Sequence, residues 1–144
     1  MKRDYALYQV ALKAMIRKNG QVLFLRLNES ENRLDLPGGR IDNVESKVPL
    51  EKILEREIKE ELGHGIKYKL EKPLFQFRRA TKSKLRGVFN LLTVYEAKFI
   101  SGKIKLSPEH TSYEWINPEA YQFKPKDFFN KEEYLAFKKY FGQK

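Results

Sequence analysis

The residues best able to do chemistry are three glutamates on one predicted helix. Glu57, Glu60 and Glu61 stand at positions i, i+3 and i+4, so their side chains emerge on one side of that helix. Like charges at this spacing cost about 0.2–0.5 kcal/mol per pair in an isolated helix. A hard divalent cation would offset the repulsion, because such ions prefer oxygen ligands. The alternative is a solvated surface helix, since runs of charge usually face water.

A glycine pair precedes the predicted helix and favours a ligand site over a solvated surface helix. Gly38 and Gly39 follow Leu36 and Pro37. A backbone without a Cβ can approach phosphate oxygens closely, or offer a carbonyl oxygen to a metal. The sequence therefore favours a metal or phosphate site where the glycine loop meets the glutamates.

Together these residues resemble the Nudix box, G-x5-E-x7-R-E-U-x-E-E-x-G-U, in which U is an apolar residue. Gly39 and Glu45 match the first half, and residues 56–63 match every fixed position of the second half. Two departures stand out: ten residues rather than seven separate Glu45 from Arg56, and the last apolar position is His64. We place the three-residue insertion in the loop before the helix, where it bears most on the role of Glu45.

The resemblance implies a Mg²⁺-dependent hydrolase, with Mn²⁺ as the alternative ion. It implies that Glu57, Glu60 and Glu61 hold the metal, together with the Gly38 carbonyl. Glu57 would ligate a metal or orient the catalytic water, and Arg56 would fix the cluster by ion pairing. Such a metal screens the phosphate oxygens and lowers the pKa of bound water.

The sequence does not decide which residue is the general base: a glutamate of the box or a carboxylate on a later loop. Within the family it belongs to a box glutamate in some members and to a later carboxylate in others. Glu109 and Glu114 are the later candidates here, and His110 could titrate near neutral pH. The alternative for Glu109 and His110 is an ordinary solvated loop.

A second feature is a run of basic residues, Arg78, Arg79, Lys82, Lys84 and Arg86. We expect it on a hairpin loop near the box, where Arg78 and Arg79 would join Gly38 and Gly39 in holding substrate phosphates. An RNA backbone is another ligand for such a run. The alternative is a charged tip that keeps an edge strand soluble.

Length and composition set the broad class. The chain has 144 residues, which fits a single domain over 1–144, and it has no cysteine for a disulfide or thiolate site. No stretch approaches the eighteen or so apolar residues of a membrane helix, and we expect a cytoplasmic protein, monomeric or homodimeric. The formal charge of +10 favours an anionic partner such as a nucleotide, polyphosphate or RNA.

The pattern of apolar residues predicts the elements that position these groups. We expect strands at 5–17, 21–27, 34–36, 66–77, 88–100, 103–106 and 113–116, and helices from Pro49 to 62 and over 131–141. Asn19-Gly20 predicts a hairpin turn, Pro73 a bulge or edge, and Asn117-Pro118 a helix start. Asn130 is predicted to cap the last helix, and Leu50 and Leu135 are expected on the apolar faces of the two helices.

These elements indicate an α/β or α+β fold with a mixed sheet, and the resemblance implies an α/β/α sandwich with the box helix packed on the sheet. Trp115 and the phenylalanines at 75, 77 and 89 are expected in the core. Stacking on a base is the alternative for the three phenylalanines.

The range of candidate substrates is limited only by what the family resemblance implies. In the family, a proline in the window after the box suggests ADP-ribose hydrolases and a tyrosine suggests dinucleoside polyphosphate hydrolases. Residues 79–82 of this chain hold neither. Nucleoside triphosphates are therefore the leading substrate. The alternatives are hydrolysis of RNA 5′ ends and a non-catalytic nucleotide- or RNA-binding module, since a fold does not imply a function.

Overall fold

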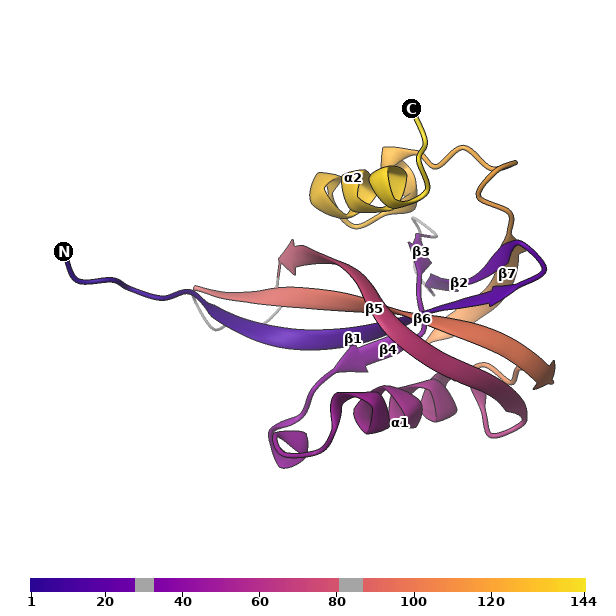
Figure 1. The fold of residues 1–144 in the computed structure, drawn as a ribbon, viewed down its shortest axis with the longest axis horizontal. Coiled ribbons are helices and arrows are strands. Elements are labelled where there is room, and N and C mark those ends of the chain that lie inside the picture. Colours follow the sequence, from indigo (N-terminus) through magenta and orange to yellow (C-terminus); the bar gives the residue numbers. More distant parts are fainter. Residues whose placement is uncertain (28–32, 81–86) are drawn as a thin grey trace.

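Two helices cover opposite faces of one mixed β-sheet (Figure 1). The computed structural model describes residues 1–27, 33–80 and 87–144. Within those residues the sheet has seven strands, in the order β3-β2-β1-β6-β5, with β4 paired to β1 and β7 paired to β2. Strands β1 and β6 run parallel, whereas the other pairs are antiparallel. The predicted α/β fold with a mixed sheet is confirmed.

The strands and helices have the following bounds. The strands are β1 Leu7–Lys18, β2 Gln21–Leu27, β3 Leu34–Asp35, β4 Gly38–Arg40, β5 Ile66–Ala80, β6 Val88–Gly102 and β7 His110–Ile116. The helices are α1 Leu50–Leu62 and α2 Lys131–Tyr140, and short 3₁₀ helices lie at Asn43–Glu45 and Pro125–Asp127. In Figure 1 the sheet lies between α2 above and α1 below.

Alternation along β1 explains why both faces of the sheet are covered. Successive side chains of a strand point to opposite faces. Leu12 and Ile16 pack in one buried cluster with Ile58 of α1, whereas Met15 packs in another with Phe137 of α2. A strand that is apolar on both faces needs a layer on each, so β1 is the centre of the sandwich.

Several local predictions are confirmed. Asn19 and Gly20 have positive φ angles of 50° and 77° between β1 and β2, as a tight hairpin turn requires. The register of β5 against β6 shifts on both sides of Pro73, which marks the predicted bulge. The Asn130 side chain accepts a hydrogen bond of 2.8 Å from the Glu133 backbone N–H, so it caps α2.

Residues 103–106 do not form the predicted strand. The Lys105 N–H donates instead to the Leu62 carbonyl at 2.9 Å, and the Ser107 N–H donates to the Glu61 carbonyl at 3.0 Å. The backbone of this segment therefore satisfies the free carbonyls at the end of α1.

Other predictions differ in detail. Pro49 lies at the cap position, one residue before α1, and Asn117 caps a turn rather than a helix, by accepting from the Glu119 N–H at 2.9 Å. Leu50 and Leu135 do not join the buried faces of their helices, because their side chains are exposed.

The predicted aromatic core is correct except at one position. Phe77 is buried, and Phe75 and Trp115 pack against the buried clusters. Phe89 is instead 45% exposed. In addition, no helix in the described part of the chain is long and apolar enough to cross a membrane.

The packing of α2 gives a stability prediction. The Phe137 ring is buried against the rings of Phe75 and Phe128, at centroid distances of 5.2 and 4.9 Å. Phe137→Ala should lower the free energy of unfolding by about 3–5 kcal/mol, because it leaves a cavity among these rings. Leu135→Ala, on the exposed side of the same helix, should change it by less than about 0.5 kcal/mol. Urea unfolding measures both, and equal losses would contradict this packing.

Candidate functional site

Gly38 and Gly39, the pair called the glycine loop below, begin strand β4 and pair with β1 rather than forming the predicted free loop, and they lie close to α1. The Gly38 N–H donates a hydrogen bond of 3.2 Å to Glu61 Oε2. A Cβ added to Gly39 would lie 2.5 Å from Glu57 Oε2, so the lack of a side chain lets the loop reach this carboxylate. The structure therefore brings Gly38, Gly39, Glu57 and Glu61 together.

Arg56 ties three glutamates to one guanidinium. Its Nε and Nη2 bind the two Glu45 carboxylate oxygens at 2.6 and 2.8 Å. Its Nη1 binds Glu60 at 2.7 Å, and its Nη2 also binds Glu57 at 2.9 Å. Glu45 therefore contacts α1 although ten residues separate it from Arg56, and hydrogen bonding to Arg56 lowers the pKa of Glu45.

The three predicted metal ligands have different surroundings. Burial raises the pKa of Glu61 to about 8, against the opposing charge of Lys13, and burial also raises the pKa of Glu57. The Glu57 side chain is 14% exposed, whereas that of Glu60 is 58% exposed. Glu57 and Glu61 therefore lie inside the site, and Glu60 lies at its rim, bound to Arg56.

Whether this site can bind a divalent cation depends on the oxygen ligands that its side chains supply. Among the described residues, no three acidic or histidine side chains converge closely enough to hold a metal ion. Glu57 and Glu61 nevertheless supply partly buried carboxylate oxygens, the donors that Mg²⁺ prefers. A cation would also relieve the cost of ionising Glu61 in a buried place. The donor set fits a hard cation, and Glu60 would have to turn away from Arg56 to join it.

A buried network of charges lies beside the glycine loop, and the sequence did not predict it. Lys13 Nζ contacts Asp35 Oδ2 at 3.1 Å and the Leu36 carbonyl at 3.2 Å. Arg79 binds Asp35 Oδ1 at 3.0 Å and also pairs with Glu133. This network joins β1, β3, β5 and α2 directly ahead of Gly38. Its only signals in the sequence are a lysine and an aspartate inside otherwise apolar strands.

Opposite charges keep Asp35 ionised despite its burial. Burial alone would raise the pKa of Asp35, but Arg79 and Lys13 hold it well below its ordinary value. Glu133 is buried too, and burial raises its pKa against the opposing charge of Arg79. Lys13 and Arg79 together thus stabilise the Asp35 carboxylate, whereas Arg79 is the only one of the two that contacts Glu133.

The predicted basic loop is corrected at its start. Arg78 and Arg79 lie in strand β5, not in a hairpin loop. Arg78 Nη2 binds Glu132 at 2.8 Å, and the Arg79 guanidinium stacks 3.9 Å from the centre of the Phe129 ring. Their charges are therefore already paired within the protein. The remaining members, Lys82, Lys84 and Arg86, lie outside the described residues.

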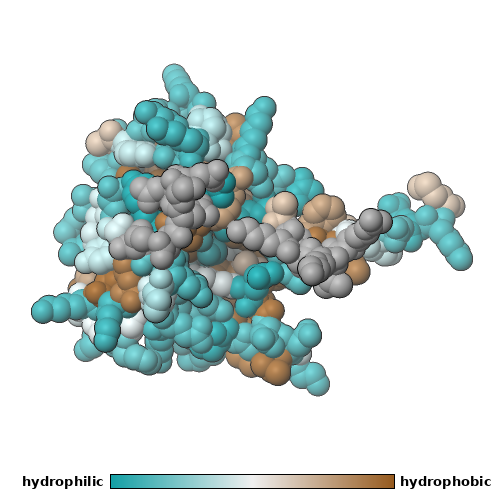
Figure 2. Space-filling view, turned by 180° about the vertical axis from the view of Figure 1, so that it is seen from behind, coloured by the Kyte–Doolittle hydropathy of each residue, from teal (hydrophilic) through white to brown (hydrophobic). Residues whose placement is uncertain are grey.

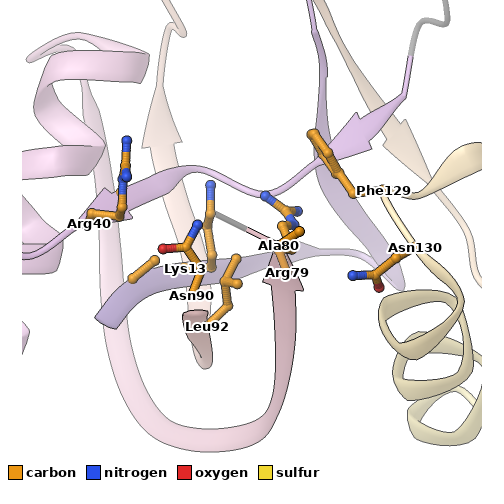
Figure 3. Close-up of a pocket in the computed structure, with 10 residues that line it drawn as sticks. Lys13, Arg40, Arg79, Ala80, Asn90, Leu92, Phe129 and Asn130 are labelled. Carbon is orange, nitrogen blue, oxygen red and sulfur yellow. The ribbon is translucent and has the colours of Figure 1, made fainter. Parts of the chain in front are cut away.

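A cavity of about 410 Å³ opens beside the glycine loop (Figure 3). Its lining includes Lys13, Gly39, Arg40, Arg79, Asn90 and Phe129. Arg40 donates 2.9 Å to the neutral Gln9 side chain, and no carboxylate of the described residues lies within ion-pair distance of it. Asn90 Oδ1 is buried without a hydrogen-bond partner in the described part of the chain. The cavity thus offers one cation without an acidic partner and one unsatisfied amide.

The candidate general bases outside the box, Glu109, Glu114 and His110, differ in exposure and in their partners. Glu109 is exposed on the loop before β7, and Glu114 binds Arg26 at 2.9 Å on the surface. His110 is buried, and burial lowers its pKa, so its ring is neutral at pH 7. No described residue offers a hydrogen-bond partner to His110 Nδ1. This burial therefore argues against the prediction that His110 titrates near neutral pH.

The raised pKa of Glu61 predicts a pH-dependent stability in metal-free buffer. Glu61 is protonated in the folded protein up to about pH 8, whereas it ionises near its ordinary pKa of 4.5 in the unfolded chain. Between these values the unfolded chain loses the proton first, so the free energy of unfolding should fall as the pH rises, by at most about 1.4 kcal/mol per pH unit. Urea unfolding in EDTA from pH 5 to 8 measures this.

Glu61→Gln should flatten the profile, because glutamine cannot ionise. Glu60→Gln is the matched control at an exposed position of the same helix, and it should keep the wild-type slope. An unchanged slope in Glu61→Gln would contradict the burial of an acid at this site.

Comparison with known proteins identifies the fold. No family model matches the sequence, and no curated protein does. A MutT protein from Methanosarcina mazei is 23% identical with a TM-score of 0.66, covering 97% of this chain and 94% of its own. A MutT Nudix hydrolase from Burkholderia pseudomallei is 23% identical with a TM-score of 0.66, covering 94% and 97%. An ADP-ribose pyrophosphatase from Streptococcus suis is 17% identical with a TM-score of 0.58, covering 89% and 87%. The chain therefore has the fold of the Nudix hydrolases.

Proposed function

We propose that this protein is a Nudix hydrolase that cleaves a phosphoanhydride bond in a nucleoside diphosphate linked to another moiety, with nucleoside triphosphates as its leading substrates. The observation that carries the proposal is the contact of Gly38 and Gly39 with the partly buried carboxylates Glu61 and Glu57. This contact lies next to a cavity large enough for part of a nucleotide. The fold and the box residues 56–63 support the same function.

The proposed reaction is the attack of water on a phosphorus atom of the substrate. The new P–O bond forms as the bridging P–O bond breaks, which yields a nucleoside monophosphate and pyrophosphate from a triphosphate, and the proton of the water passes to a base. A bound Mg²⁺, or Mn²⁺, would screen the phosphate oxygens and lower the pKa of a coordinated water. Glu57, Glu60, Glu61 and the Gly38 carbonyl would hold it.

The chain's own residues would position these groups. Arg56 would keep Glu57 and Glu60 in register, as its hydrogen bonds to both side chains suggest. Glu57 would orient the water or accept its proton, with Glu109 as the later-loop alternative. Because Glu57 is partly buried, its raised pKa suits proton transfer better than that of a free carboxylate.

Arg40 is the residue that we propose for binding substrate phosphate. The predicted pair, Arg78 and Arg79, is already bound to acidic side chains. Arg40 lines the cavity next to Gly39 and has no such partner in the described chain. A phosphate beside Arg40 could therefore form an ion pair with a guanidinium that no carboxylate of the described residues already binds.

The test is a hydrolysis panel with the released phosphate species identified. It includes nucleoside triphosphates, oxidised nucleotides, nucleotide sugars, ADP-ribose, dinucleoside polyphosphates and triphosphorylated RNA, with and without magnesium. Glu57→Gln should lower kcat by about 10²-fold or more, because it removes a ligand or base. Glu55→Gln, on the same helix and bound only to Lys52 at 3.4 Å among the described residues, should leave kcat unchanged.

Turnover that survives Glu57→Gln would overturn the assignment of this site. Binding of nucleotides without any turnover across the panel would favour the non-catalytic module instead.

Magnesium should also stabilise the folded protein. Binding to the folded state alone contributes about 2.7 kcal/mol at a hundredfold excess over Kd, so the melting temperature should rise. The rise should be larger at pH 8.5 than at pH 6.5, because Glu61, with a pKa of about 8, must lose its proton to bind the ion. Thermal unfolding with and without MgCl₂ measures this.

Glu57→Gln and Glu60→Gln should remove most of the magnesium-induced rise, whereas Glu55→Gln should keep it. The same rise in all three variants would remove the metal-site assignment.

A further inference from the structure

Two aromatic side chains lie exposed at the end of the sheet where the N-terminal arm leaves the molecule. Tyr8 of β1 and Phe89 of β6 are 39% and 45% exposed. They are direct partners in the parallel pairing of the two strands, and their ring centroids lie 5.8 Å apart. Figure 2 shows apolar surface gathered at the base of this arm. We call these two residues the aromatic pair.

The aromatic pair adjoins the substrate cavity on two sides. One hollow of about 270 Å³ is lined by Tyr8 and Phe89, by the ion pair of Arg78 with Glu132, and by Arg79, Ala80 and Asn130. The last three residues line the cavity as well. A second hollow, of about 560 Å³, is lined by Tyr8 and by Arg40, which also lines the cavity. A ligand that extends out of the cavity past Arg40 can therefore reach the Tyr8 ring, in a hollow that Asp42 also lines.

The chemistry of this surface favours a nucleic acid. Exposed aromatic rings beside cations are the combination with which proteins hold single strands, because every base has a face that can stack. Arg40 lacks an acidic partner in the described residues, and the exposed arm carries Lys2 and Arg3. The chain as a whole has a formal charge of +10, which opposes pairing with a second copy and favours a polyanion.

We propose that the aromatic pair stacks on a base of a single-stranded RNA whose 5′-triphosphate end occupies the cavity. The cleavage of that end rests on the proposed function, but the binding of the strand does not. The terminal nucleotide is then the nucleoside triphosphate unit of the substrate, and the rest of the strand passes over Arg40 onto Tyr8 and Phe89.

The first test is binding in magnesium-free buffer, where the proposed hydrolysis does not occur. The probes are a fluorescent, 5′-triphosphorylated RNA of eight nucleotides and a fluorescent nucleoside triphosphate. Tyr8→Ala and Phe89→Leu should each raise the Kd for the RNA about tenfold, because each removes a stacking ring. Neither should change the Kd for the nucleoside triphosphate.

Tyr113→Ala is the matched control, since Tyr113 is 43% exposed on β7. It should leave both affinities unchanged. Tyr8→Phe keeps the ring and should retain RNA affinity, so a loss in Tyr8→Ala that Tyr8→Phe restores cannot come from unfolding. Unchanged RNA affinity in both Tyr8→Ala and Phe89→Leu would overturn the proposal. A shift of these variants from dimer to monomer in light scattering, without a loss of RNA affinity, would also overturn the proposal. It would assign the aromatic pair to a contact between two copies of the chain.

Hydrolysis separates this proposal from the proposed function. With magnesium, the substitutions should raise KM for the triphosphorylated RNA about tenfold and leave KM for the nucleoside triphosphate unchanged. Equal effects on both substrates would overturn the role of the aromatic pair. No hydrolysis of either substrate, together with ring-dependent RNA binding, would overturn only the proposed function.

Discussion

The site depends on the close packing of a glycine loop between a strand and a helix. Gly38 lies so near β1 that a Cβ there would collide with the Leu12 carbonyl oxygen, and its φ of 141° is one that other residues rarely adopt. A Cβ on Gly39 would lie 2.5 Å from Glu57 Oε2. A side chain at Gly38 would collide with the β1 backbone, and one at Gly39 would displace the Glu57 carboxylate. The absence of two Cβ atoms thus sets the distance between the loop and the carboxylates.

Positive charge is distributed unevenly among the buried acids of this region. Lys13 and Arg79 surround Asp35 and keep it ionised. Glu61 also feels Lys13, but burial dominates and raises its pKa to about 8. A buried carboxylate without enough positive charge is costly to ionise, which is the condition that a bound cation relieves. The network around Asp35 therefore supports the loop, while Glu61 is left in need of a cation.

Ten residues, rather than the seven of the motif, separate Glu45 from Arg56, yet their side chains are in contact. Asn43–Glu45 forms a short 3₁₀ helix, in which the Asp42 side chain accepts from the Val44 N–H at 3.1 Å and Glu45 bonds back to the Asp42 N–H at 3.2 Å. Glu45 is thereby held where it reaches Arg56. His64, the other departure from the motif, is exposed, so an apolar residue is not needed there.

Features that arise from neighbouring residues could be predicted from the sequence. The turn at Asn19-Gly20, the cap at Asn130 and the bulge at Pro73 depend on local backbone preferences. Helix geometry likewise places Glu57 and Glu61, four residues apart, on the side of α1 that meets the glycines. Which charges are paired and which rings are covered depends instead on the tertiary structure. Asp35, Arg79 and Glu133 are far apart in the chain, and Arg79 is buried because three separate elements meet there. Burial and pairing are properties of surfaces brought together by folding, and no local pattern in the sequence carries them.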